Sequence, residues 1–63
     1  MNRMKKFDLE VNGDRLNGFQ AMSFEDVIKI FFDGLFELGN PIFHGFNIVD
    51  KSQRVVGSIR EVA

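Results

Sequence analysis

The side chains that most often carry out chemistry in proteins are few and scattered in this sequence. His44 is the only histidine and there is no cysteine, so the chain holds neither a histidine pair nor a histidine–cysteine set for a metal ion. A histidine that acts as a general base also needs an acidic or nucleophilic partner within hydrogen-bond reach, and none stands close to His44 in sequence. We therefore expect His44 to be a partly buried structural residue and not a catalytic one.

The remaining polar residues give the same result. The carboxylates show no spacing typical of a metal site, the glycines form neither a P-loop nor a dinucleotide fingerprint, and the serines lie in no nucleophile elbow. A stripe of charge is best interpreted as the solvated face of a helix, although it could also dock against a basic surface. Its members are Glu25, Asp26, Asp33 and Glu37, with Lys29 among them. We predict no enzyme activity, no metal and no cofactor.

Composition indicates one small intracellular domain. The chain has 63 residues and a net charge of −1, which gives no electrostatic case for binding nucleic acid or an anionic membrane. No apolar run approaches the ~20 residues of a membrane span. The absence of cysteine favours the cytoplasm. We expect a single domain over residues 1–63, with residues 1–4 frayed.

The most strongly marked element is a helix that begins after Ser23. The Ser23 hydroxyl can cap the first turn, and Gly39 followed by Pro41 can end the helix after Leu38. At about 100° per residue, one side of this helix is apolar and carries Phe24, Val27, Ile28, Phe31, Leu35 and Leu38. Ile30, Phe32 and Phe36 lie on its shoulders. Gly34 lies beside the apolar face, where it could allow another backbone to approach closely.

A hairpin is expected before the helix. Residues alternate from Lys5 to Val11, and Asn12-Gly13 is a strong signal for a two-residue turn. Pairing around this turn places Val11 opposite Asp14, Glu10 opposite Arg15, Leu9 opposite Leu16 and Phe7 near Gly18. Beyond that point Phe19 and Ala21 take the inner face, and Gly18 is the natural position for a bulge.

A second hairpin is expected after the helix, from strands over 42–49 and 54–60 joined by residues 50–53. In the predicted register Ile48 pairs with Val55, Phe46 with Gly57 and His44 with Ile59, so that His44 points toward the helix. The resulting fold class is α+β: a ββαββ chain with a mostly antiparallel four-stranded sheet and one helix across one face. The order of the strands in the middle of the sheet cannot be derived from the pattern.

This fold leaves more apolar residues than one helix can cover. We predict a surface for binding other proteins, made of Phe43, Val49, Arg54, Val56, Arg60, Ile30, Phe32 and Phe36. Exposed apolar clusters usually mark association sites, so the leading hypothesis is a non-enzymatic protein-interaction module. We expect the chain to form a homodimer, which would also help to stabilise so small a domain, and to bind a larger protein partner, and the two are compatible.

The alternative hypothesis is a small module that binds RNA or single-stranded DNA. It would use Phe43, Arg54 and Arg60 on the open face of the C-terminal hairpin. In size and style the chain resembles, without a shared motif, the accessory proteins carried by bacteriophages and other mobile elements. That resemblance implies an accessory or inhibitor protein that occupies a surface on a larger protein.

Overall fold

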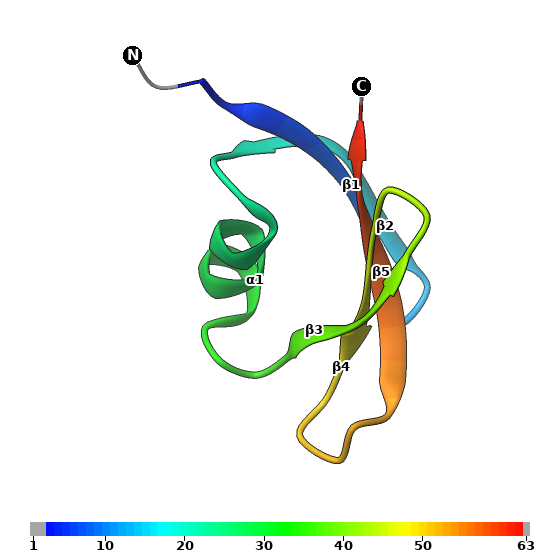
Figure 1. Cartoon of the computed structure of the whole chain (residues 1–63). Coiled ribbons are helices and arrows are strands. Elements are labelled where there is room, and N and C mark those ends of the chain that lie inside the picture. The colour runs from blue at the N-terminus through cyan, green and yellow to red at the C-terminus, as the bar shows by residue number, and fades with distance from the viewer. Residues whose placement is uncertain (1–2, 63) are drawn as a thin grey trace.

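A computed structural model describes residues 3–62 of the chain. Five antiparallel strands form one sheet in the order β2-β1-β5-β4-β3, and one helix lies against one of its faces (Figure 1). The elements are β1 (Lys5–Val11), β2 (Asp14–Ala21), α1 (Phe24–Phe32), β3 (Glu37–Ile42), β4 (Gly45–Val49) and β5 (Val55–Val62). The predicted α+β class is therefore confirmed, whereas the prediction of four strands is one strand short.

The N-terminal hairpin forms as its sequence predicts. Asn12 and Gly13 have φ values of 52° and 88°, which a two-residue type I′ turn requires. The register pairs Glu10 with Arg15 and Leu9 with Leu16. At Gly18 (φ 71°) the predicted bulge interrupts the ladder, and the Gly18 N–H donates instead to Asp8 Oδ1 at 2.9 Å. Residues 1 and 2, for which fraying was predicted, lie outside the described residues.

The helix begins where predicted but ends six residues earlier than Leu38. Ser23 Oγ accepts a hydrogen bond from the Asp26 N–H at 3.2 Å, so the N-cap is confirmed. The last helical residue is Phe32, because Asp33 takes the left-handed conformation (φ 45°, ψ 48°) and its N–H donates to the Lys29 carbonyl. Gly34 follows with φ 86°. The helix is thus ended by Asp33 with Gly34 directly after it, and the prediction that Gly39 ends the helix was wrong.

The residues predicted to complete the helix form the additional strand, β3. Leu38 pairs with Ile48 and Pro41 pairs with Phe46, with an irregularity between them. Pro41 is tolerated because β3 is an edge strand, where the missing N–H breaks no ladder between two neighbours. Gly39 has a packing role here: a Cβ on it would lie 2.7 Å from Val49 Cγ1.

The C-terminal hairpin differs from its predicted register by two residues. Phe46 pairs with Ile59 and Ile48 with Gly57, and a bulge separates Ile48 from Val49. A shift of two leaves side chains on the same face, so Phe46, Ile48 and Ile59 face the helix as predicted. The loop is held by Asp50 Oδ1, which accepts the Ser52 and Arg54 N–H groups at 2.9 and 3.0 Å.

The core lies between α1 and the sheet face that it covers. It consists of Phe7, Leu9, Ala21, Val27, Ile28, Ile48 and Ile59. The Phe24 ring of the helix contacts rings from two strands: its centroid lies 4.9 Å from that of Phe7 in β1 and 5.1 Å from that of Phe46 in β4. β1 and β5 are central neighbours, with Leu9 opposite Ile59, so the two ends of the chain form the middle of the sheet.

Candidate interaction surfaces

The candidate residues for chemistry are dispersed in the described part of the chain. Within 3–62 no group of three or more histidine, cysteine or acidic side chains comes close enough together to hold a metal ion. His44 is not the partly buried strand residue that was predicted: it occupies the turn between β3 and β4 with φ 64°, is exposed, and packs its ring against Phe43, with 4.0 Å between ring centroids. In the same part of the chain, no helix is long and apolar enough to cross a membrane.

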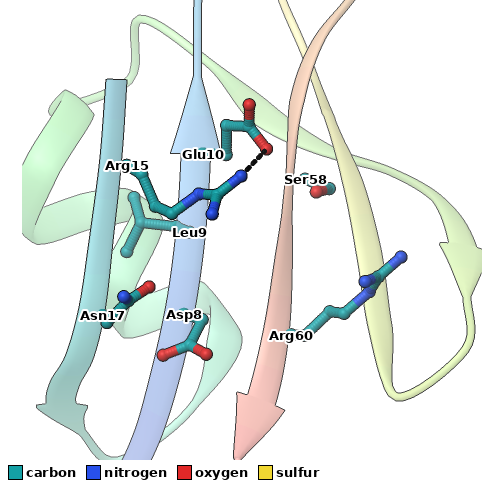
Figure 2. Close-up of a pocket in the computed structure, with 7 residues that line it drawn as sticks. All are labelled: Asp8, Leu9, Glu10, Arg15, Asn17, Ser58 and Arg60. Carbon is teal, nitrogen blue, oxygen red and sulfur yellow. Dashed lines mark ion pairs between the residues drawn. The ribbon is translucent and has the colours of Figure 1, made fainter. Parts of the chain in front are cut away.

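The sheet face opposite the helix is polar where it crosses β2, β1 and β5. A shallow depression of ≈ 270 Å³ crosses β2, β1 and β5 on this side (Figure 2). It is lined by Asp8, Leu9, Glu10, Arg15, Asn17, Ser58 and Arg60. Acidic and basic side chains alternate across it, so it presents no concentrated charge of either sign.

The two arginine side chains of this face extend in different directions and do not converge on one point (Figure 2). Arg15 reaches from β2 across β1, and its Nη2 lies 3.7 Å from Glu10 Oε1, whereas Arg60 extends from β5 over β4 (Figure 2). An exposed pair of this kind contributes little to stability, on the order of 0–1 kcal/mol. Arg15 is thus already engaged with a carboxylate, and a phosphate on this face would meet Asp8 and Glu10 as well. The geometry does not favour nucleic-acid binding here.

Half of the residues predicted to form the interaction surface are buried or partly buried. Val49 is 6% exposed, and Val56, Phe32 and Phe36 are partly buried against the core. The bulge explains why Val56 is not on the surface. Between the Ile48–Gly57 and Val49–Val55 pairs, β5 has one extra residue, Val56, which reverses the alternation of its side chains. Val55 is therefore 58% exposed, and Val56 packs against the core. Phe32 and Phe36 pack on each other, with ring centroids 4.9 Å apart, where the chain turns from α1 to β3.

The other predicted residues are exposed but do not all come together. Phe43, in the turn between β3 and β4, is the most exposed large apolar residue at 79%. Arg54 ends the loop at the opposite end of the β4–β5 hairpin, since Gly45 pairs with Arg60 while Val49 pairs with Val55. Arg54 therefore lies apart from Phe43 and Arg60, which are at the same end of the hairpin.

A different apolar surface lies where α1 faces the edge strand β2. Ile30, Phe31 and Leu16 are 64%, 41% and 39% exposed, and we call these three residues the helix–β2 surface. Phe31 packs edge-to-face on Phe19 of β2 at 4.5 Å, which joins the helix to the strand. A depression of ≈ 240 Å³ between them is lined by Leu9, Val11, Asn12, Asp14, Arg15, Leu16, Phe31 and Phe32.

Only Ile30 of this surface was among the predicted residues. Leu16 and Phe31 were assigned to the buried side of their elements from periodicity alone. Both are left open because α1 ends at Phe32 and β2 is at the edge of the sheet, so nothing in the described chain extends over them. Periodicity identifies the side of an element that faces the core, but it does not show which residues of that side are covered by another element.

Comparison of the chain with protein-family models, with curated proteins and with solved structures found no match. The function is therefore argued from the surfaces described above.

Proposed function

We propose that this chain is a non-enzymatic protein-interaction module and that it binds a protein partner, a second copy or a larger protein, through the helix–β2 surface. The observation that supports the proposal is the exposure of Leu16 and Phe31 at one depression beside the Phe19–Phe31 contact, with the exposed Ile30 next to Phe31 in the helix. Single exposed apolar residues are ordinary, whereas a contiguous group is typical of an association site.

The surface has the composition expected of a small interface. Its centre is aromatic and aliphatic, and the exposed polar residues Arg15, Lys29 and Asp33 lie next to it in sequence. Full burial of a large apolar side chain contributes about 1.5–3 kcal/mol. Scaled by their exposed fractions, Ile30 would contribute about 1–2 kcal/mol on binding, and Phe31 and Leu16 about 1 kcal/mol each. Three such contributions suffice for a specific contact if the partner matches its shape.

The finer part of the proposal concerns the biological role. A chain of this size without a catalytic arrangement among its described residues is suited to act by occupying a surface on a larger protein, as an accessory or inhibitor protein does. The resemblance to the accessory proteins of bacteriophages and other mobile elements points in the same direction.

The test is a tagged co-purification from the native cells, with and without nuclease, using the wild type and two variants. Ile30→Asp places a charge in the helix–β2 surface, and Phe43→Asp places the same charge at an exposed site outside it. We expect a stoichiometric protein that survives nuclease, is lost with Ile30→Asp and is kept with Phe43→Asp. Loss with Phe43→Asp alone would move the site to the β3–β4 turn, and partners that disappear with nuclease would overturn the proposal in favour of nucleic acid.

A further inference from the structure

The two edges of the sheet are unequal in their readiness to accept another strand. β3 carries Pro41, which has no N–H to donate, and its pairing is already irregular between Leu38 and Pro41. β2 pairs regularly with β1 from Asp14 to Leu16, the bulge follows at Asn17 and Gly18, and the stretch from Asp14 to Asn17 is exposed. Of the two edges, β2 is the one with free hydrogen-bonding capacity beside an apolar surface.

The backbone groups that β2 offers follow from its turn. In a two-residue hairpin the flanking residues, here Val11 and Asp14, exchange hydrogen bonds, and the direction of the groups then alternates along each strand. The Asn12 N–H, which donates to the Val56 carbonyl at 3.0 Å on the other side of β1, fits this alternation. The N–H and C=O groups of Arg15 therefore point away from β1, toward solvent, and continued alternation predicts the same direction for those of Asn17, the first residue of the bulge.

We propose that the partner at this surface is a second copy of the chain, whose β2 pairs antiparallel with the first about a two-fold axis at Leu16. Arg15 of each copy then stands opposite Asn17 of the other, and their outward N–H and C=O groups form four main-chain hydrogen bonds. Leu16 faces Leu16 in the closer, non-hydrogen-bonded type of pair, with Cβ atoms about 4.5–5.5 Å apart. The bulge at Gly18 ends the pairing.

The strand is self-complementary in polarity as well as in hydrogen bonding. Paired residues share a face, so the two helices lie on the same side of the joined sheet, and Ile30 and Phe31 of each copy flank the Leu16 pair. No like charges meet at the axis, because Arg15 faces the neutral Asn17 and is already directed to Glu10 at 3.7 Å.

The exposed area around β2 is large enough for a stable dimer interface. A stable interface buries about 800 Å² per partner, which is about one sixth of the 4695 Å² that the chain exposes. The edge of β2, the helix–β2 surface and the polar residues beside them lie in one region, and association would also add stability to a domain of only 63 residues. This inference rests on the proposed function, since it names the occupant of the same surface.

The test measures assembly of the purified full-length chain by analytical ultracentrifugation over a concentration series. The wild type is expected to sediment as a dimer that dissociates on dilution. Leu16→Glu and Leu16→Lys should each raise the dissociation constant at least a hundredfold, because each puts two like charges face to face at the axis. An equimolar mixture of the two variants should restore a dimer, which would also show that both variants fold. Phe43→Glu, outside the contact, should leave the dissociation constant unchanged.

Two results would overturn the proposal. A wild type that remains monomeric up to about 1 mM would remove the second copy as the partner, while the Ile30→Asp co-purification would still decide whether another protein binds there. A dimer that Leu16→Glu leaves intact, or folded variants whose mixture stays monomeric, would show that the axis does not pass through Leu16. Far-UV circular dichroism establishes folding, and if neither Leu16 variant folds, Ile30→Glu on the exposed helix must weaken the dimer or the proposal fails.

Discussion

Replacing Gly34 by alanine distinguishes two interpretations of where the helix ends, because they predict changes of opposite sign in the free energy of unfolding. If the helix continued to Leu38, Gly34 would be an interior helical residue, and Gly34→Ala would stabilise the domain by about 1 kcal/mol. In the structure Gly34 follows the last helical turn with φ 86°, and no other atom lies within 4 Å of a Cβ built on it. The substitution therefore introduces backbone strain without a clash, and we expect a loss of about 1–2 kcal/mol.

The magnitude is large for so small a domain. Unfolding entropy is about 2.1 cal/mol/K per residue, so 1 kcal/mol corresponds to a shift in Tm of about 8 °C for 63 residues. Thermal and urea unfolding followed by far-UV circular dichroism would both resolve it. D-alanine at position 34, introduced by chemical synthesis, adopts the left-handed conformation readily and should raise the stability above that of the wild type.

Lys29→Ala is the matched control, since Lys29 is exposed within the helix and alanine is a slightly better helix former. Its expected effect is within about 0.5 kcal/mol of zero. A Gly34→Ala variant that is more stable than the wild type would refute the assigned helix end, and with it the strand over 37–42.

Two further predictions concern the start of the helix and the centre of the sheet. Ser23→Ala removes the acceptor for the Asp26 N–H and should lower the free energy of unfolding by about 1 kcal/mol, whereas Ser23→Asp should retain most of it; urea unfolding of both variants measures the difference. Gly57→Ala places a methyl group on the Glu10 carbonyl oxygen and should cost about 3 kcal/mol or more, enough to leave much of the chain unfolded at 25 °C by circular dichroism. A Gly57→Ala variant of wild-type stability would contradict the direct pairing of β1 with β5.

Local signals in the sequence were sufficient for the first half of the fold. The Asn12-Gly13 turn, the bulge at Gly18 and the cap at Ser23 each depend on residues within a few positions of one another, and the structure confirms all three. Alternating apolar residues on either side of the turn then determine which side chains reach the core.

The end of the helix could not be derived in the same way because two stop signals compete. Gly34 and Gly39 are both suitable, and Leu35 and Leu38 continue the helical period as well as they fit a turn followed by a strand. Which glycine follows the helix is determined by tertiary contacts. β4 offers Ile48 and Phe46 as partners, and residues 37–42 gain a hydrogen-bonded ladder there that a longer helix would forgo.

The position of the apolar surface depends on the same kind of long-range information. Gly57 allows the β1 backbone to approach β5, and the Val11–Gly57 pairing that results places the ends of the chain in the middle of the sheet. With β1 central, β2 becomes an edge strand, and the bulge beside Val49 turns Val56 toward the core. Of the exposed apolar residues, Leu16 and Phe31 lie between α1 and β2 because strand order, which no local pattern encodes, decides which apolar residues the single helix can cover.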